Sequence, residues 1–353
     1  MMFSDKLILW YEENGRSLPW RSTQNPYYIW LSEIILQQTR IEQGMSYYHR
    51  FVETFPTVND LAAASEQEVL KLWQGLGYYS RARNLHKAAR YIVDKLDGIF
   101  PTSYELILSL PGVGKYTAAA IASFAFQLPH PVIDGNVYRF ISRLYGIDIP
   151  IGTDQAFRFF EAKLIQLIDT KRSGQFNQAL MDFGSLYCKP VNPDCDHCVF
   201  YQECVARRQR RVEFLPIKKS KTQVRDRWFY YFVLEWLDGD KEMTLMHCRE
   251  KGDIWQGLYE FPLLEKQQRI NEKELSKESN SFLEQFGLKM LRNVDIVALA
   301  PHKLSHQTIH ATFISLKIDS KVPKNTEKYA PIEWEKIKSL PVSRLIDRYL
   351  SQL

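Results

Sequence analysis

The hydrophobic positions of this chain change their spacing after residue 227. Before that point apolar residues recur at helical intervals, as in 6–13, 117–126 and 137–145, and strand-like runs are absent. From Trp228 to Trp236 the chain is aromatic and β-branched, and an Asp-Gly pair follows as a hairpin turn signal. The pattern predicts an all-α region followed by a separate α+β domain.

The distribution of charged residues along the chain indicates where the two regions are connected. Within 207–227 there are nine Lys and Arg residues against two Asp and Glu residues, whereas the whole chain of 353 residues has a net charge of only +5. Such a stretch suits a phosphate backbone, and it equally suits a solvated linker. We expect a helical region at 1–206, a basic linker at 207–227 and a second domain at 228–353.

The chain carries no sign of a membrane segment. No apolar run approaches the roughly 20 residues of a membrane span, and the first sixteen residues lack the layout of a signal peptide. We expect a cytosolic protein that does not bind membranes.

Two glycines, Gly112 and Gly114, separate two helical patterns. Glycine leaves backbone N–H groups uncovered, and the helix after it begins with unpaired amides and the positive end of its dipole. Such a hairpin binds a phosphate through its backbone. The turn that begins at Asp134 would set a carboxylate close by. Asp134 is also a favoured N-cap for the next helix, and the two roles are compatible.

Glu33 lies in an otherwise apolar helical stretch. Its helical neighbours Ile29, Trp30 and Leu36 place the carboxyl group on an apolar face. A carboxyl group there finds a partner or keeps its proton, and a raised pKa is what a general acid needs at neutral pH. A structural salt bridge inside the helical core is the alternative.

Two aromatic residues, Tyr78 and Tyr79, follow a flexible Gly-Leu-Gly turn. Adjacent aromatic residues on a tight loop cannot both face one helix core, so stacking against exposed bases is a natural role. The alternative places one ring in the core and the other on the surface.

Four of the five cysteines fall within 17 residues with the spacing C-x6-C-x2-C-x5-C. In a cytosolic protein such a cluster predicts a metal site rather than disulfides. Zinc and an iron–sulfur cluster both accept four thiolates, so both stay open on geometry. We interpret the remaining Cys248 as a small core residue. The clustered residues are Cys188, Cys195, Cys198 and Cys204.

These motifs together resemble a known family. Leu110-Pro-Gly-Val-Gly114, followed by Asp134, resembles the helix-hairpin-helix–Gly/Pro–Asp superfamily of DNA glycosylases. The cysteine spacing is similar to that of its endonuclease III and MutY branch, which implies a 4Fe–4S cluster. Residues 255–262 resemble the start of the Nudix-like domain of MutY-type adenine DNA glycosylases. The resemblance covers nearly the whole chain.

The resemblance implies a role for several residues. Glu33 would be the general acid and Asp134 the anionic stabiliser or nucleophile, supported by Tyr116 and Asn136. The hairpin residues Gly112, Val113 and Gly114 would contact the DNA backbone. Positions that match the surroundings of a flipped adenine are Arg16, Trp20, Arg21, Trp30 and Leu36, and positions that match residues wedged into the duplex are Gln38 and Tyr79.

The implied activity is hydrolysis of the N-glycosidic bond of adenine opposite 8-oxoguanine or guanine in double-stranded DNA, after base flipping. Bifunctional relatives carry a Schiff-base lysine two residues after the second hairpin glycine. Tyr116 occupies that place here, and Lys115 points elsewhere on the helix, so we predict a monofunctional enzyme.

The second domain of the family reads 8-oxoguanine with a Phe-Ser-His loop. Ser305 and His306 keep the polar part of that loop, while Leu304 replaces the aromatic residue. Residues 267–286 lack the glutamate pattern of a pyrophosphohydrolase, so the resemblance favours recognition over hydrolysis there. A polar turn between strands is the alternative for this loop.

Two other functions are weighed against this one. A related glycosylase would act on oxidised or mismatched pyrimidines, and Tyr116 and the second domain argue against it. A non-enzymatic DNA-damage binding module would not need both Glu33 and Asp134. A monomer is the simplest expectation for the assembly.

Overall fold

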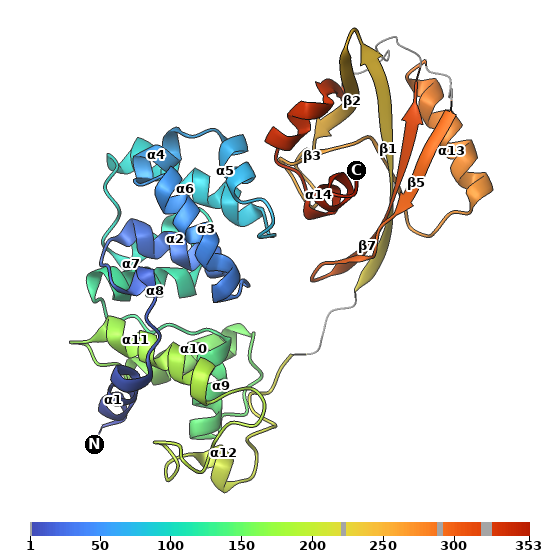
Figure 1. Ribbon diagram of the computed structural model, residues 1–353. Helices are drawn as coiled ribbons and strands as arrows, with labels where there is room; N and C mark the ends of the chain where they lie inside the picture. The colour runs from blue at the N-terminus through green and yellow to red at the C-terminus, as the bar shows by residue number, and fades with distance from the viewer. Residues whose placement is uncertain (1, 220–223, 288–291, 319–326) are drawn as a thin grey trace. The chain divides into compact units, whose positions relative to one another are not determined.

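The computed structural model divides into two compact units (Figure 1). The first unit comprises 1–63 and 84–220, and the second comprises 64–83 and 221–353. The sequence pattern assigns 64–83 to the helical region, whereas its contacts group it with the second unit. The residues that the structure describes are 2–219, 224–287, 292–318 and 327–353.

The first unit is built from helices, as the apolar spacing predicts. In its described residues the only β-type pairing is an isolated bridge between Ile151 and Lys218. The first four residues of α6 group with the second unit. The elements are α1 (Phe3–Asn14), η1 (Pro19–Arg21), α2 (Pro26–Leu36), α3 (Ile41–Thr54), α4 (Val58–Ala63), α6 (Ser80–Leu96), α7 (Tyr104–Ser109), α8 (Lys115–Phe126), α9 (Gly135–Tyr145), α10 (Asp154–Ile165), α11 (Ser173–Asp182), the π-helical turn η2 (Phe183–Tyr187) and α12 (Val205–Arg208).

The small side chains of α8 place it in the middle of this unit. Every residue from Thr117 to Phe124 is buried, and five of these eight positions are alanine or serine. Helices α2, α7 and α11 pack against α8. Because small side chains let helix backbones approach closely, residues of α2, α8 and α11 can line a single cavity.

The second unit contains a mixed sheet with the strand order β3-β2-β1-β7-β5. The long strands β1 and β7 run parallel, while the other pairs are antiparallel. The elements are α5 (Glu66–Leu72), β1 (Arg225–Asp238), β2 (Lys241–Cys248), β3 (Tyr259–Glu260), β4 (Leu263–Lys266), α13 (Glu272–Gln285), β5 (Arg292–Ala298), β6 (His302–Lys303), β7 (Gln307–Lys317), β8 (Ala330–Glu333), η3 (Trp334–Ser339) and α14 (Arg344–Leu350).

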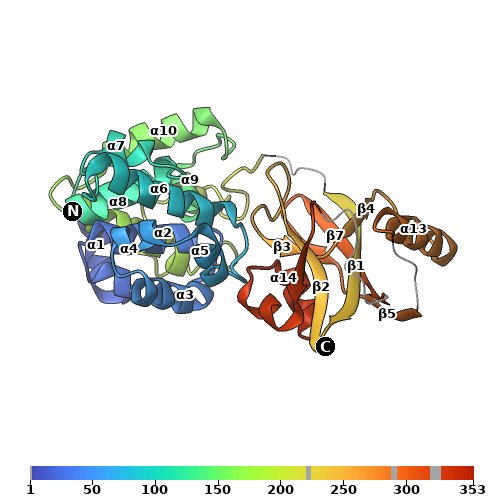
Figure 2. The same cartoon turned by 90° about the horizontal axis from the view of Figure 1, so that it is seen from above.

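The sheet has a helix on each face, α14 on one and α13 on the other (Figure 2). Alternate residues of β1 supply both cores: Tyr231 packs in the cluster that includes α14, and Phe232 packs in the cluster that includes α13. This double burial explains why the sequence of β1 is apolar without interruption, since a strand covered on both faces needs no polar side.

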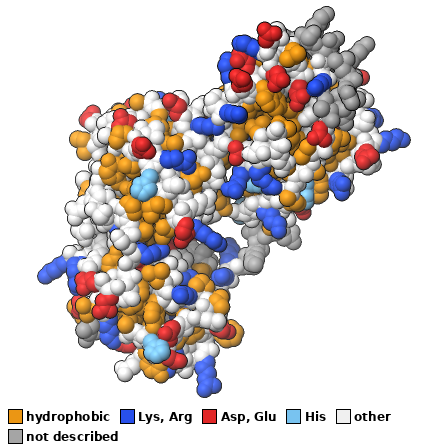
Figure 3. All heavy atoms as spheres, in the orientation of Figure 1, with side chains coloured by type: hydrophobic (Ala, Val, Ile, Leu, Met, Phe, Trp, Pro, Cys, Tyr) orange, Lys and Arg blue, Asp and Glu red, His pale blue; other side chains and the backbone are white. Residues whose placement is uncertain are grey.

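The surface of both units carries charges of both signs, with hydrophobic side chains between them on the face that Figure 3 shows. Within the described residues, no helix combines the length and the apolar character that crossing a membrane would require.

Candidate active site and cysteine loop

One cavity in the first unit brings together the two carboxyl groups that the sequence singles out. It has a volume of about 450 Å³, within the usual range for ligand pockets. Glu33 reaches it from α2 and Asp134 from the residue before α9. The residues that line it are Arg16, Leu18, Trp20, Arg21, Glu33, Leu36, Thr39, Arg40, Ile41, Glu42, Tyr116, Phe124, Asp134, Asn136, Gln178, Met181 and Ser185.

Glu33 sits on a helix whose start the sequence fixes. Pro26 occupies the first turn of α2, and the Asn25 side chain accepts a hydrogen bond from the Tyr27 N–H group. Glu33 is only 9% exposed. Burial raises the pKa of Glu33 to about 7, against the opposing hydrogen bond from Tyr116 and the charge of Arg21. Glu33 can therefore hold a proton near neutral pH, as the apolar neighbours predict.

Asp134 is the N-cap of α9. Its Oδ1 atom accepts from the Val137 N–H group at 2.7 Å, and its Oδ2 atom accepts from the Asn136 amide at 2.8 Å. The Asn136 amide oxygen in turn accepts from Arg139 at 2.8 Å. Burial raises the pKa of Asp134, while these donors and Arg139 act in the opposite direction. The capping role does not compete with a role in the cavity, since the cap also lines it.

Tyr116 reaches the cavity from α8 and lies beside Glu33. Its hydroxyl group is hydrogen-bonded to Glu33 and also lies 3.2 Å from the Met181 Sδ atom, and burial together with the charges of Glu33 and Asp134 raises its pKa well above the ordinary value. Lys115, the next residue back, lies over the ring of Phe157 at 4.3 Å. Among the described residues that line the cavity none is a lysine. Tyr116 therefore offers a hydrogen bond where a Schiff-base enzyme would need an amine.

The remaining residues expected around a flipped base divide into two groups. Arg16, Trp20, Arg21 and Leu36 line the cavity. Trp30 does not, and this prediction is wrong. Its side chain is fully buried in the core, where its ring packs against Phe100 at 5.7 Å. Trp30 lies one turn before Glu33 on α2, but the Trp30 side chain fills space in the core of the helical unit.

Gln38 lies in the turn after α2 and is exposed. Its φ of 53° is in the left-handed region, which is uncommon for a residue other than glycine. Its placement allows contact with a ligand outside the protein.

Sequence reasoning missed the end of α11, which supplies Gln178, Met181 and Asp182 to this region. Gln178 and Met181 line the cavity. The Asp182 carboxylate accepts from both Arg16 and Arg21. Asp182 stands between apolar neighbours in the sequence, the same signal that identifies Glu33.

The glycine hairpin lies between α7 and α8. Gly112 has a φ of +77°, and a Cβ atom there would lie 2.5 Å from the Asn84 Cβ atom, so only glycine fits. Val113 is 7% exposed. Gly114 is the N-cap of α8, has open space around its Cα atom and offers no side-chain cap. The unpaired N–H groups at the start of α8 are thus uncovered, as a phosphate contact requires.

The two adjacent tyrosines of the second unit point in different directions. Tyr79 is 5% exposed and its hydroxyl donates to the Val342 carbonyl at 3.3 Å, so the prediction that Tyr79 enters the duplex is wrong. Tyr78 is 47% exposed, and its hydroxyl is hydrogen-bonded to Ser305. The left-handed φ of 48° at Tyr78 turns its side chain away from the core that holds Tyr79.

The Leu304–His306 segment is the turn between β6 and β7. Ser305 and His306 are exposed, whereas Leu304 packs against the core cluster that contains α14. The turn closes with a bond from the Leu304 N–H group to the Gln307 carbonyl at 2.8 Å. Two polar side chains of the predicted loop are therefore accessible, and Leu304, which replaces an aromatic residue, is partly buried against the core.

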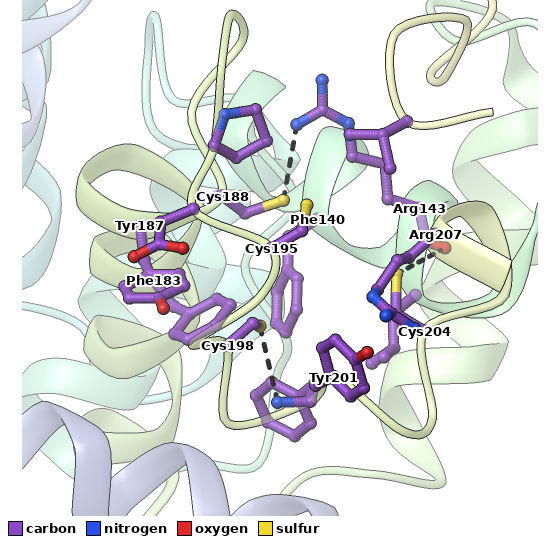
Figure 4. A pocket seen from close by; sticks show the side chains of 15 residues that line it. Phe140, Arg143, Phe183, Tyr187, Cys188, Cys195, Cys198, Tyr201, Cys204 and Arg207 are labelled. Atoms are coloured by element: carbon purple, nitrogen blue, oxygen red, sulfur yellow. Dashed lines mark hydrogen bonds between the residues drawn. The ribbon is translucent and has the colours of Figure 1, made fainter. Parts of the chain in front are cut away.

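The four clustered cysteines line a second cavity of the first unit, of about 30 Å³ (Figure 4). Arg143 and the Phe200 N–H group donate to the sulfurs of Cys188 and Cys198 at 3.5 and 3.4 Å. Such N–H donors suit the sulfur ligands of an iron–sulfur cluster, so this donor set fits the group. In the described part of the chain no three His, Cys, Asp or Glu side chains are already arranged as ligands of one metal ion.

The basic segment after the cysteines is fixed on the first unit rather than free. Arg211 pairs with Asp148, and the Leu215 carbonyl accepts from Arg143 at 3.1 Å. Leu215 is 2% exposed. The part of 207–227 up to Lys218 is therefore packed on the first unit, and Arg225–Arg227 belong to β1.

Comparison with known proteins finds matches along both regions of the chain. Residues 31–164 match the HhH-GPD superfamily of base excision DNA repair proteins, and 231–352 match a NUDIX domain. An adenine DNA glycosylase of Buchnera aphidicola subsp. Baizongia pistaciae is 34% identical over 316 residues, which cover 88% of this chain and 84% of the relative. The adenine DNA glycosylase of Homo sapiens is 42% identical over 224 residues, 60% of this chain and 40% of the relative.

A solved structure of a thermostable thymine-DNA glycosylase superposes on this chain with a TM-score of 0.55 at 28% identity, covering 59% of this chain and 95% of that one. The match is thus to the helical architecture, while the first relative extends through both domains. By its sequence, the chain belongs to the adenine DNA glycosylase family of the HhH-GPD superfamily.

Proposed function

We propose that this chain hydrolyses the N-glycosidic bond of adenine mispaired with 8-oxoguanine or guanine in double-stranded DNA. The observation that carries the proposal is that Glu33, Asp134 and Tyr116 line one cavity, with the Tyr116 hydroxyl group hydrogen-bonded to Glu33. A mispaired adenosine costs little to extrude from the duplex, and a cavity of about 450 Å³ accommodates a nucleobase.

The reaction follows from the protonation states of the two acids. Protonated Glu33 donates its proton to a ring nitrogen of adenine, and the purine leaves with the electron pair of the N-glycosidic bond. The sugar then carries oxocarbenium character, which ionised Asp134 stabilises. A water molecule adds to the anomeric carbon and loses a proton. The products are free adenine and an abasic site.

The N-cap donors have a role in this step. They keep the Asp134 carboxylate in one orientation, so its charge is already placed when the sugar becomes cationic. Asn136 itself is held by Arg139. The supporting role of Asn136 and Tyr116 is thus to fix the two acids and to exchange hydrogen bonds with them.

DNA would be bound outside the cavity by several groups. The N–H groups of Gly112 and Gly114 would contact the DNA backbone, while that of Val113 already donates to the Leu110 carbonyl at 3.1 Å. Tyr78, rather than Tyr79, and Gln38 would enter the duplex, and Ser305 with His306 would contact the base opposite adenine. Their exposure and the hydrogen bond between Tyr78 and Ser305 support these roles. We expect the enzyme to act as a monomer in the cytoplasm.

The cysteine loop would hold a 4Fe–4S cluster through Cys188, Cys195, Cys198 and Cys204. When bound, the cluster supplies iron–thiolate bonds that tie the loop together. Arg143 holds this loop from inside, since its guanidinium group donates to the carbonyls of Lys189 and Pro190 at 2.6 and 3.1 Å. The loop can then present its basic residues to DNA in a fixed arrangement.

A glycosylase assay tests the substrate. Duplex oligonucleotides carry adenine opposite 8-oxoguanine, adenine opposite guanine, or thymine glycol, and hot alkali reveals abasic sites. We expect cleavage of the two adenine substrates. Cleavage at thymine glycol alone would favour the pyrimidine-specific alternative, and no abasic site in any duplex would favour a binding module.

The absence of lysine from the described cavity wall bears on the second activity of such enzymes. A monofunctional enzyme forms no Schiff base, so borohydride should trap far less protein–DNA adduct than the amount of adenine released. Trapping at levels comparable to turnover would contradict the monofunctional mechanism.

A further inference from the structure

A buried carboxylate behind the cavity wall connects two of its arginines. Asp182 is the last residue of α11, and its side chain has no exposed surface. Its Oδ2 atom accepts from the Arg16 N–H group at 3.0 Å and from the Arg21 Nη1 atom at 2.7 Å. Its Oδ1 atom accepts from the Arg16 Nε atom and the Arg21 Nη2 atom, each at 2.9 Å. The Arg16 Nη2 atom also donates to the Oδ1 atom of Asp182.

Asp182 is ionised in this arrangement. Burial alone would raise the pKa of Asp182, but the hydrogen bonds and charges of Arg21 and Arg16 outweigh burial and lower it. Arg16 and Arg21 both line the cavity. The cavity wall therefore contains two cations that share one buried anion.

Arg21 is close enough to Glu33 to affect its proton. The positive charge of Arg21 favours the ionised form of Glu33, opposite to the effect of burial. Two other groups face Glu33, Tyr116 from α8 and Asp134 at the start of α9. Arg40 and Glu42 lie further along the cavity wall. Among these groups Arg21 is the cation that would ionise Glu33 most directly.

Arg21 is held by more than Asp182. Its Nη1 atom also donates to the Arg16 carbonyl at 3.1 Å, and its guanidinium group lies 5.7 Å from the centre of the Tyr11 ring. The fork–fork pairing with Asp182 uses both terminal nitrogens, and this geometry fixes the plane of the guanidinium group. A guanidinium group paired in this way cannot turn to form a salt bridge with Glu33.

We propose that Asp182 is a positioning residue that holds the Arg21 guanidinium group away from an ion pair with Glu33, so that Glu33 keeps its proton. The proposal rests on the role of Glu33 as general acid. Without the negative charge of Asp182, Arg21 would be a buried cation that lacks an anionic partner. Glu33 is a carboxyl group on the same cavity wall. Arg21 and Glu33 would then form an ion pair, and Glu33 would lose its proton.

The test is the pH dependence of adenine excision by Asp182→Asn, measured with the full chain in single turnovers on a duplex with adenine opposite 8-oxoguanine. The variant keeps the shape of the side chain and loses its charge. We expect the alkaline limb of the rate profile to move down by about one pH unit, a loss of about tenfold on that limb and little at acid pH. An equal loss at every pH would overturn the proposal and leave a purely structural role.

A second variant keeps the test decisive if Asp182→Asn does not fold. Arg21→Met removes the cation and keeps an apolar side chain of similar reach, so the alkaline limb should move to higher pH, opposite to the first variant. A shift in the same direction, or none, would overturn the proposal. Asp182→Glu, which restores the charge, should return the limb towards its original position.

A matched control separates this effect from the loss of any ion pair. Asp5→Asn removes the partner of Arg172 at the surface, where the two side chains are 35% and 42% exposed, and should leave the profile unchanged. A shifted profile in this control would also overturn the proposal. Failure of the proposed function is distinguishable, because full excision by Glu33→Gln would remove Glu33 as the acid whatever Asp182 does.

Discussion

Replacing Glu33 by Gln should abolish excision and at the same time stabilise the protein. The glutamine side chain has the same shape and can still accept a hydrogen bond from Tyr116, but it has no proton to donate. A general acid contributes about 10²- to 10⁴-fold in rate, so turnover should fall at least that much while the affinity for the mispaired duplex stays within a few-fold.

The effect on stability follows from the pKa of Glu33. The value rises from 4.5 to about 7 on folding. Between these two values the folded protein holds a proton that the unfolded chain has released, so the free energy of unfolding falls as pH increases. The loss amounts to about 3 kcal/mol once the pH exceeds 7. Glutamine does not titrate, so the variant escapes this loss.

Urea denaturation of both proteins at pH 4.5 and at pH 8 measures the difference. The gap in unfolding free energy between Glu33→Gln and the parent should increase by about 3 kcal/mol from the lower to the higher pH. An effect of the glutamine amide on stability that is the same at both pH values cancels in this comparison. A gap that is the same at both pH values would refute the burial argument, because Glu33 would then ionise alike in the folded and unfolded chains.

Five other substitutions, one alone and four in matched pairs, separate local roles. Asp134→Asn keeps a good N-cap but loses the charge, so single-turnover excision should fall about 100-fold or more, with a change in unfolding free energy below about 1 kcal/mol in denaturation. Gly112→Ala should lower the free energy of unfolding by about 1–3 kcal/mol in the same measurement because of the positive φ at this position. Gly114→Ala should change the free energy of unfolding by no more than about 0.5 kcal/mol and weaken binding to duplexes of any sequence. Equal losses of stability in the two variants would contradict the hairpin argument. Cys198→Ser should abolish the visible absorption expected of an iron–sulfur protein, and Cys248→Ser should retain it; a colourless parent protein would point to zinc.

The sequence was sufficient for elements and residues whose environment is local. The helical spacing predicts α8 and α9 closely, and the apolar neighbours of Glu33 correctly predict a raised pKa. Asp134 could be assigned as a cap because capping involves residues only three positions apart. The uninterrupted apolar run of β1 indicates a strand, although its parallel pairing with β7 depends on a distant segment.

The failures concern side-chain direction and partners far away in sequence. Trp30 and Leu36 both lie one turn from Glu33, yet only Leu36 faces the cavity, since the Trp30 ring is taken up by Phe100 in the core. Tyr78 and Tyr79 are distinguished by one left-handed φ angle that the sequence does not reveal. Asp182 was missed because its arginine partners are more than 160 positions away along the chain.

Helix α9 has a fixed contact at each end. Its N-terminal cap is Asp134 in the cavity, and near its other end Arg143 is 3% exposed and donates to the backbone of the cysteine loop. Eleven helical residues span only about 16 Å, and a helix that short moves as a rigid rod. A change that loosens the cysteine loop should therefore shift the Asp134 carboxylate at the far end of the helix and lower turnover.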